Sequence, residues 1–165
     1  MNITAQQIVD LCPEVTLLSA EKHAPTIAAA MQEFGIDDVD FVKAIAAASN
    51  NFLKLTETFN YSATELQKQF PKKFADNTIA TLYEYKQEKI AIRIYSGKDG
   101  NSNEPRSDGW TYRGRGFFKI CCRNNYYYCG RALNLDLLAN PAYLSTPAGA
   151  ARSSAWLWKT KGETK

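Results

Sequence analysis

The sequence has no apolar run long enough to cross a membrane. Its alanine-rich stretches, such as TIAAAM and AIAAA, fall far short of the roughly 20 residues that a spanning helix needs. The first residues, MNITAQQIVDLCPE, have neither a basic start nor an apolar core. We therefore expect no membrane span and no signal peptide.

Residues that commonly bind metals are also scarce: the chain has one histidine and four cysteines. It has no CxxC pair, and His23 lies about a hundred residues from Cys121, Cys122 and Cys129. Two adjacent cysteines do not resemble the regular framework of a disulfide-stapled secreted domain. We therefore expect no metal site, no cofactor and a reducing compartment.

Positive charge is sparse in the first third of the chain. Residues 1–60 carry three Lys/Arg against eight Asp/Glu, whereas residues 61–165 carry seventeen against nine. A basic second part suits an anionic polymer such as nucleic acid or a bacterial wall. Seventeen cations spread over this length are equally typical of an ordinary solvated surface, so charge alone does not identify a partner.

The composition is that of one globular domain. With 165 residues, 45% hydrophobic and 22% charged, the chain can bury one core and is short for two, so we expect a single domain over residues 1–165. Helical spacing and capping residues predict a mainly α fold with at most a small β-hairpin. The predicted helices cover residues 4–11, 24–35, 38–52, 61–70, 78–95, 124–138 and 147–162.

Two of these predictions depend on particular residues. In the third helix, Phe41, Ile45, Ala48 and Phe52 fall on one face, which we expect to be buried. The fourth begins with Ser62, and Glu65 stands where a capping box places its carboxylate. Residues 96–109 contain three glycines and few apolar side chains, which predicts a long exposed loop.

The stretch RGRGFFKI after this loop partly fits an RNA-recognition signature. It agrees at Arg113, Gly114, Gly116 and Phe117, but Arg115 and Ile120 stand where stacking rings are required. The surrounding chain also lacks the alternating strands on which such rings are displayed. We therefore expect no nucleic-acid partner.

A sugar-binding wall explains more of this region, because glycans are bound by aromatic faces and by donors to their hydroxyl and N-acetyl oxygens. The alternative is that Trp110, Phe117 and Phe118 are simply core residues. The residues that would supply the wall are Tyr112, Arg113, Arg115, Lys119, Asn124, Asn125 and Tyr126.

Three segments resemble the family-19 glycoside hydrolases, in particular their bacterial and phage endolysin branch near the chitinases. They are NFLKLTETFNYSATELQKQFPKKF, SDGWTYRGRGFFKICCRNNYYYCGRAL and NLDLLANPAYLSTPAGAARSSAWLWKTKG, which together cover roughly residues 40–162. The resemblance implies a lysozyme-like helical fold with a glycan cleft between two lobes. It also implies inverting hydrolysis of an N-acetylhexosamine polymer, either peptidoglycan or chitin.

The catalytic motif of that family is altered here. An inverting glycosidase needs one protonated carboxyl and one ionised carboxyl. The family's H-E-S-G-G-F motif aligns with AASNNF, so Ala47 replaces the histidine, Ala48 replaces the general acid, and Asn50 and Asn51 replace the glycines. The second carboxylate found nine positions later in related lysins is retained as Glu57.

Further positions of the implied cleft have also changed. Lys119 replaces a glutamine that faces the substrate in the family. Cys121 replaces a Thr or Ser that holds the attacking water, and Cys122 replaces a glycine. A thiol is a poorer hydrogen-bond partner than a hydroxyl. The resemblance assigns substrate contact to the altered position Lys119 and to six residues that match the family pattern. These six are Tyr61, Tyr112, Arg113, Arg115, Asn125 and Tyr126.

These changes favour a catalytically inactive relative that binds a cell-wall glycan, or a protein in the altered cleft. The alternative is an active hydrolase that uses Glu57 with a recruited acid, for which Glu65 and Asp108 are candidates. A nucleophilic Cys121 is a weaker hypothesis, because no histidine is expected beside it.

Relatives continue with further helices beyond KGETK, so the comparison suggests a chain truncated at its C-terminus. We expect the protein to be cytoplasmic, or to be delivered to the cell wall by a phage or a secretion system.

Overall fold

The computed structural model describes residues 2–163 and confirms the mainly helical prediction. Apart from helices, the described residues contain only two isolated antiparallel β-bridges, between Thr56 and Arg115 and between Arg115 and Ile120. The helices are α1 (Ala5–Leu11), α2 (Leu17–Glu33), α3 (Val39–Ala48), α4 (Ala63–Gln69), α5 (Asn77–Tyr83), α6 (Gln87–Ile94), α7 (Asp108–Thr111), α8 (Arg123–Leu133), the 3-10 helix η1 (Pro141–Ser145) and α9 (Pro147–Glu163). None of them is long and apolar enough to cross a bilayer.

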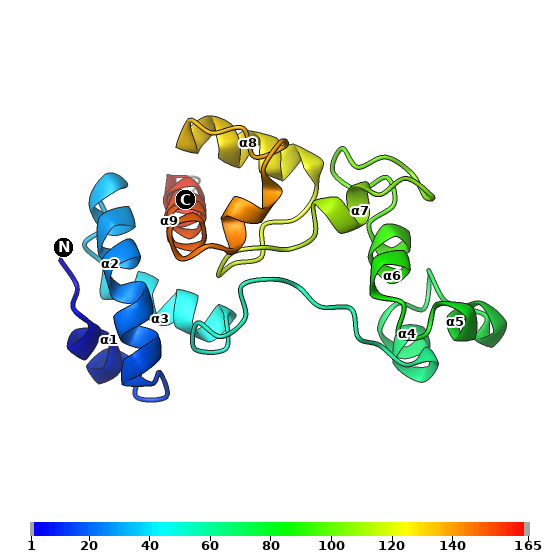
Figure 1. The fold of residues 1–165 in the computed structure, drawn as a ribbon, viewed down its shortest axis with the longest axis horizontal. Coiled ribbons are helices and arrows are strands. Elements are labelled where there is room, and N and C mark those ends of the chain that lie inside the picture. The colour runs from blue at the N-terminus through cyan, green and yellow to red at the C-terminus, as the bar shows by residue number, and fades with distance from the viewer. Residues whose placement is uncertain (1, 164–165) are drawn as a thin grey trace.

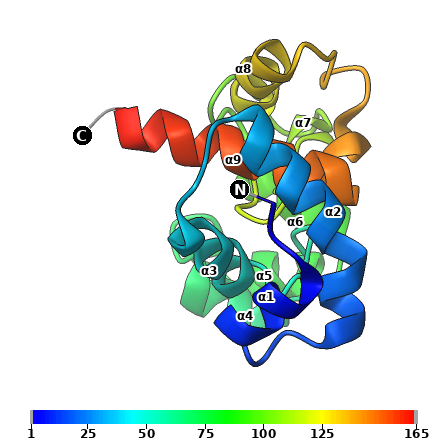
Figure 2. The same cartoon turned by 90° about the vertical axis from the view of Figure 1, so that its left-hand side faces the viewer.

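The helices form a larger body and a smaller lobe. Figure 1 shows α1–α3, α8 and α9 in the body, and α4 and α5 at the far end of the lobe. An extended segment of the chain runs between α3 and α4. Helix α9 packs against α2, α3, α8 and η1, and Figure 2 shows its last turns extending past the other helices.

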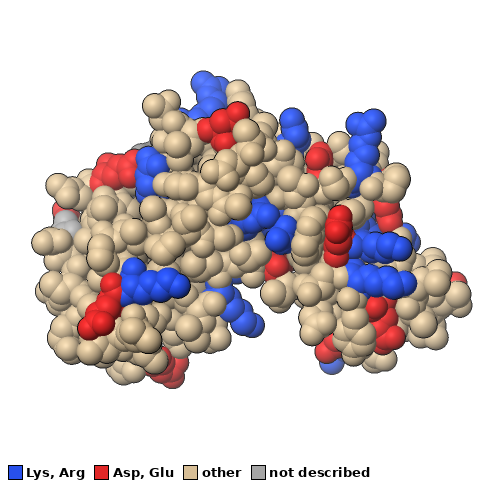
Figure 3. All heavy atoms as spheres, in the orientation of Figure 1, with Lys and Arg blue, Asp and Glu red and all other residues tan. Residues whose placement is uncertain are grey.

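The body and the lobe have separate apolar cores. In the body, residues of α1–α3 and α9 pack together with Phe52 and Phe117, while a second cluster lies between α8 and η1. In the lobe, residues of α4–α6 enclose Phe59 and Phe74, with Trp110 packed against them. Figure 3 shows the surface hollowed between body and lobe along its lower side.

Helix α2 is longer than predicted. It begins at Leu17, because the Thr16 side chain accepts a hydrogen bond from the backbone N–H of Ser19 at 3.2 Å. Pro25 lies inside the helix, where it removes one backbone donor, yet its neighbours Ala24 and Ile27 are buried in the body. The burial of this face holds the helix together across the proline.

Helix α3 is shorter than predicted and ends at Ala48. Asn50, Asn51 and Phe52 have φ angles of 49°, 59° and 69°, which turn the chain through three left-handed residues. The predicted buried face is therefore correct at Phe41 and wrong at Ala48, which is exposed. Phe52 is buried, but it reaches the core from the turn and not from the helix.

The single helix predicted over residues 78–95 is two helices, because contacts with α4 break it. The Glu84 carboxylate accepts from the backbone N–H of Ala63 at 3.0 Å. Tyr85 has a φ of 59° and donates its backbone N–H to the Tyr61 carbonyl at 2.9 Å. The predicted capping box of α4 is confirmed, with Ser62 and Glu65 bonded reciprocally.

The 96–109 segment is less exposed than predicted. Asn101 is buried and donates its amide to the Tyr95 carbonyl at 3.0 Å, and Asp108 accepts from the backbone N–H of Ser102 at 2.7 Å. Asp108 also begins the short helix α7, so the segment ends in a helical turn.

The last two α-helices, α8 and α9, compare differently with their predicted lengths. Helix α8 ends earlier than predicted, because Asn134 takes a left-handed conformation with a φ of 58°. The α9 prediction over residues 147–162 is confirmed, with Ala151 and Ala155 buried and Trp158 partly buried against the core.

Candidate functional site

Glu57 lies on the extended segment between α3 and α4, where it is fixed by hydrogen bonds to two distant parts of the chain. Its backbone N–H donates to the Gly114 carbonyl at 2.7 Å. Its Oε2 accepts from the Gly114 N–H at 3.0 Å, and its Oε1 accepts from the Tyr95 hydroxyl at 2.6 Å. Both carboxylate oxygens are therefore oriented by the protein, and the side chain remains half-exposed.

This arrangement requires a glycine at position 114. A Cβ atom there would lie 2.9 Å from Glu57 Oε2 and 3.0 Å from Lys119 Cβ. The backbone of Gly114 therefore fits between these two side chains only because it has none. The close approach places Glu57 and Lys119 beside the same backbone position.

Tyr95 is a site residue that the sequence analysis missed. It follows the last residue of α6 and belongs to no recognisable motif, so only its contact with Glu57 reveals it. Burial raises the pKa of the Tyr95 hydroxyl, and its hydrogen bond to Glu57 raises it further. Tyr95 therefore remains a neutral donor to the carboxylate at neutral pH.

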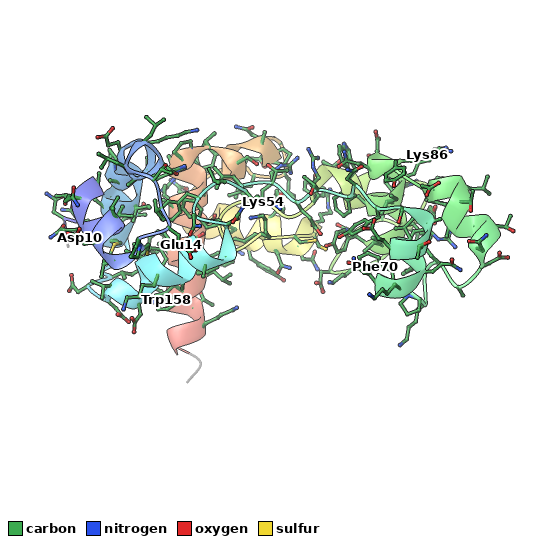
Figure 4. The ribbon with its side chains drawn as sticks, turned by 90° about the horizontal axis from the view of Figure 1, so that it is seen from below. Asp10, Glu14, Lys54, Phe70, Lys86 and Trp158 are labelled. Carbon is green, nitrogen blue, oxygen red and sulfur yellow. The ribbon has the colours of Figure 1, made fainter. Side chains whose placement is uncertain are left out.

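Lys119 occupies a tight turn, with a φ of 53°, beside Glu57. Its ammonium group donates to the carbonyl of Lys54 and, at 3.2 Å, to that of Gly116. Burial lowers the pKa of Lys119, and Glu57 partly opposes this effect. Figure 4 shows Lys54, whose carbonyl accepts from Lys119, on the part of the body nearer the lobe.

The structure places Ala48 at the last position of α3, with its methyl group exposed. Ser49 beside it is buried and turned inward, where its hydroxyl donates to the Ile45 carbonyl at 2.6 Å and accepts from the Phe52 N–H at 3.0 Å. The end of α3 thus presents a methyl group at the position where the family resemblance requires a carboxyl.

Cys121 and Cys122 have their sulfur atoms 2.8 Å apart, and both are free cysteines. Cys122 is buried, whereas Cys121 is half-buried and lines a hollow of about 270 Å³ together with Lys119 and Asn125. The pKa of Cys121 is raised by its hydrogen bond to Cys122, by burial and by Glu57. The field of Glu57 therefore reaches Cys121 as well as Lys119.

Three of the residues assigned to the glycan wall lie beneath the surface. Tyr112, Arg115 and Tyr126 are at most 6% exposed. The Arg115 guanidinium donates to the Thr111 carbonyl at 2.7 Å and to the Tyr126 hydroxyl at 2.9 Å, and the two tyrosine rings meet edge to face. In the structure these side chains brace the segment that carries Gly114.

The remaining predicted wall residues reach the surface to different degrees. Asn125 is exposed and donates to the Cys121 carbonyl at 2.9 Å. The Arg113 guanidinium is half-buried and lies 3.8 Å from the centre of the Trp110 ring. Tyr61 is also half-buried, and burial raises its pKa, with smaller contributions from Glu57 and a second carboxylate.

The two candidates for a recruited acid both hold backbone groups. Glu65 accepts from the Ser62 N–H at 2.8 Å in the α4 cap, and Asp108 accepts from Ser102. His23, the one histidine of the chain, packs against the rings of Phe52 and Phe117, each at 5.5 Å between ring centroids.

Comparison with known proteins gives the family. The family model described as "Chitinase class I", of glycoside hydrolase family 19, matches residues 46–165. A glycosyl hydrolase family 19 domain-containing protein of Haemophilus influenzae is 37% identical over 115 residues, covering 67% of this chain and 55% of that protein.

Two plant proteins show the same relationship. Endochitinase 2 of Gossypium hirsutum is 36% identical over 91 residues, covering 54% of this chain and 30% of its own. Basic endochitinase CHB4 of Brassica napus is 32% identical over 113 residues, covering 66% and 42%. The chain thus spans between about a third and just over half of these relatives' lengths. It belongs to glycoside hydrolase family 19, the family of the class I chitinases.

Proposed function

We propose that this protein is a non-catalytic member of its family that binds an N-acetylhexosamine glycan. The proposed binding surface consists of Glu57, Lys119, Cys121 and Asn125, which we call the candidate face. The observation that carries the proposal is the exposed methyl group of Ala48 at the end of α3. A methyl group cannot donate a proton to a leaving oxygen, and general acid–base help contributes about 10² to 10⁴ in rate.

The alternative, an active hydrolase with a recruited acid, is supported less well. Glu65 caps α4, and Asp108 holds the backbone of the preceding loop, so using either as an acid would cost a structural hydrogen bond. Glu57 itself is oriented by Tyr95 and Gly114, which suits a carboxylate that binds a hydroxyl group of a sugar.

The chemistry of the candidate face suits a glycan. It offers a carboxylate acceptor, an ammonium donor and an amide that both donates and accepts. Sugar hydroxyl and acetamido groups need such a mixture, and charge-assisted hydrogen bonds are the stronger kind. Cell-wall peptidoglycan and chitin share this N-acetylhexosamine chemistry, and the test separates them.

The test is a paired assay on purified bacterial sacculi and on chitin particles. Pelleting of the protein with each polymer and release of soluble fragments are both recorded. We expect pelleting without release. Lys119→Ala and Asn125→Ala should each weaken pelleting about 5-fold or more, because each removes a hydrogen bond worth roughly 1 kcal/mol or more.

Two variants serve as controls. Lys72→Ala removes an equal charge from an exposed residue between α4 and α5, and it should pellet like the wild type. Glu57→Gln tests catalysis, because fragment release by the wild type that this change abolishes would overturn the proposal in favour of an active hydrolase. Failure to pellet with either polymer would also overturn it and would favour a protein partner.

A further inference from the structure

The adjacent cysteines Cys121 and Cys122 form a close pair of free thiols that the proposed glycan binding does not explain. Their sulfur atoms are 2.8 Å apart, closer than two non-bonded sulfur atoms rest in van der Waals contact. The backbone on both sides is held. The Cys122 N–H donates to the Tyr112 carbonyl at 2.8 Å, and the Cys121 carbonyl accepts from Asn125 at 2.9 Å.

The conformation of Cys122 is unusual for a side chain of its kind. Its φ of 80° lies in the region that favours glycine, which costs an ordinary residue roughly 1–2 kcal/mol. In this conformation its sulfur lies beside that of Cys121. Glycine would be unstrained at position 122. The cysteine found there instead places its sulfur beside that of Cys121.

The pair also lies in surroundings that promote thiol chemistry. Cys122 is the N-cap of the eleven-residue helix α8, whose N-terminus favours negative charge. The hydrogen bond from Cys121 and the charge of Lys98 lower the pKa of Cys122 against the effect of its burial, whereas the pKa of Cys121 is raised, so the first negative charge of the pair lies on Cys122. Cys121, which is half-buried, lines the 270 Å³ hollow with Lys98 and Trp156 and is open to a small reagent.

We propose that Cys121 and Cys122 are a redox pair, oxidised to a vicinal disulfide by a low-molecular-weight disulfide that enters this hollow. The pair first loses one proton to solvent, which leaves a thiolate on Cys122, and Cys121 then attacks one sulfur of the reagent as its own proton passes along their hydrogen bond to Cys122. A mixed disulfide forms on Cys121, and the first reagent thiolate leaves. Cys122 then loses its proton and attacks the Cys121 sulfur, releasing the second thiolate. One disulfide and two protein thiols become one protein disulfide and two small thiols.

The covalent geometry makes such a bond reversible. Neighbouring Cα atoms are about 3.8 Å apart, which is below the usual 4.4–6.8 Å of a disulfide. A strained disulfide is reduced more readily than a structural one. The pair is therefore suited to a switch between dithiol and disulfide, and it does not staple the fold.

The other two cysteines act as internal controls. Cys129 is buried and Cys12 is half-buried. Among the described residues, the thiol–thiol hydrogen bond is that of Cys121 with Cys122, so neither control has a second thiol to take its proton or to close a disulfide. Neither should react with the reagent at a rate comparable to that of the pair.

The experiment exposes the folded protein to glutathione disulfide, quenches with acid, alkylates the remaining thiols in denaturant and digests with trypsin. Cleavage after Lys119 and Arg123 releases the peptide Ile-Cys-Cys-Arg, while Cys12 and Cys129 fall on other peptides. We expect this peptide to be unalkylated and lighter by two hydrogen atoms than the dithiol peptide, at a time when Cys12 and Cys129 are still alkylated.

Two variants and one condition complete the test. Cys122→Ser should leave glutathione attached to Cys121, because the second attack is lost. Cys122→Gly, which suits the positive φ, should do the same even if the serine variant folds poorly. In denaturant, the rate advantage of the pair over Cys12, which we expect to be at least about 10-fold, should fall because the proximity to Lys98 and to the start of α8 is lost.

Three outcomes would overturn the proposal. They are alkylation of both sulfur atoms after exposure to glutathione disulfide, a stable glutathione adduct on the wild-type pair, and equal rates for the pair and Cys12. The proposal does not depend on glycan binding, because the readout is the mass of one peptide.

Discussion

His23 shows at the scale of one residue how burial sets a chemical state. Its ring is 1% exposed between Phe52 and Phe117, and its Nδ1 has no hydrogen-bond partner among the described residues. Burial lowers its pKa, and the charge of Lys22 lowers it further. The folded protein therefore holds His23 neutral, although its sequence neighbours do not predict this.

The lowered pKa of His23 predicts a loss of stability in acid. Below the unfolded pKa of about 6.5, the unfolded chain binds a proton that the folded chain does not, so the free energy of unfolding falls as the pH drops. Well above pH 6.5 the histidine is neutral in both states, so the free energy of unfolding no longer depends on its protonation. In urea unfolding between about pH 7.5 and pH 5, the wild type should lose stability relative to His23→Leu, by at most about 1.4 kcal/mol for each pH unit.

Parallel pH dependence of the wild type and His23→Leu would contradict this prediction. The comparison is internal, because the carboxylates and all other titrating groups are the same in both proteins. A nonpolar leucine also keeps the site apolar between the two phenylalanine rings.

Gly114 is a second residue whose structural role its sequence motif does not indicate. The stretch RGRG resembles the family motif, and its arginines are predicted wall residues, yet its first glycine is required by Glu57, 57 positions earlier. Nothing in the local sequence identifies this partner. Only the tertiary fold brings Gly114 against Glu57, and Tyr95 to the same carboxylate.

At the scale of an element, the turn that ends α3 shows how residue type fits backbone conformation. Asn50, Asn51 and Phe52 are all left-handed, and the family pattern has glycines at the first two. Asparagine is among the residues that tolerate this conformation best after glycine. Asparagine at the first two positions therefore suits this turn.

Substitutions at Asn50 should separate backbone strain from side-chain contacts, because this side chain is exposed. Asn50→Ala should lower the free energy of unfolding by about 1 kcal/mol, since alanine resists a positive φ more than asparagine does. The free energy of unfolding of Asn50→Gly should equal or exceed that of the wild type. Chemical denaturation measures both.

The same two changes at Asn60, an exposed residue of the extended segment, provide the control. There alanine should be tolerated, because no positive φ is required. Equal costs for alanine at both positions would show that the left-handed turn is not the cause.

At the scale of the whole molecule, α9 links the two ends of the chain. Residues of α9 share the body core with α1–α3, and most of these three helices precede the segment matched by the family model, which begins at residue 46. Arg152 on α9 donates two hydrogen bonds to Glu33 of α2, both at 2.8 Å, and further ones to the Leu133 carbonyl and the Tyr143 hydroxyl.

Loss of the Arg152 side chain should therefore weaken the assembly of the body. Arg152→Ala should lower the free energy of unfolding by about 1–2 kcal/mol, a value kept low because its side chain and that of Glu33 are 24% and 40% exposed. Arg152→Lys should recover less than half of this lost stability, because one ammonium group cannot reach three partners as the planar guanidinium does. Thermal or urea unfolding measures these differences.

Arg106→Ala, which removes an exposed arginine from the 96–109 segment, is the matched control and should change stability little. Full recovery by Arg152→Lys would show that charge alone, without the guanidinium geometry, holds α9 to α2.

The sequence by itself determined the features that depend on near neighbours. These are the mainly helical class, the capping box of α4, the extent of α9 and the membership of glycoside hydrolase family 19. Caps and helical faces are contacts between residues three or four positions apart, so they can be read along the chain. The same local signals failed where a distant partner intervened, as at the break between α5 and α6.

Only the tertiary structure decided which side chains meet. It placed Tyr95 and Gly114 on the Glu57 carboxylate, buried Arg115 and Tyr126 under the segment assigned to a glycan wall, and left the end of α3 exposed. The physical reason is that burial and hydrogen bonding depend on contacts between segments tens of residues apart. Such contacts have no period and no spacing in a single sequence.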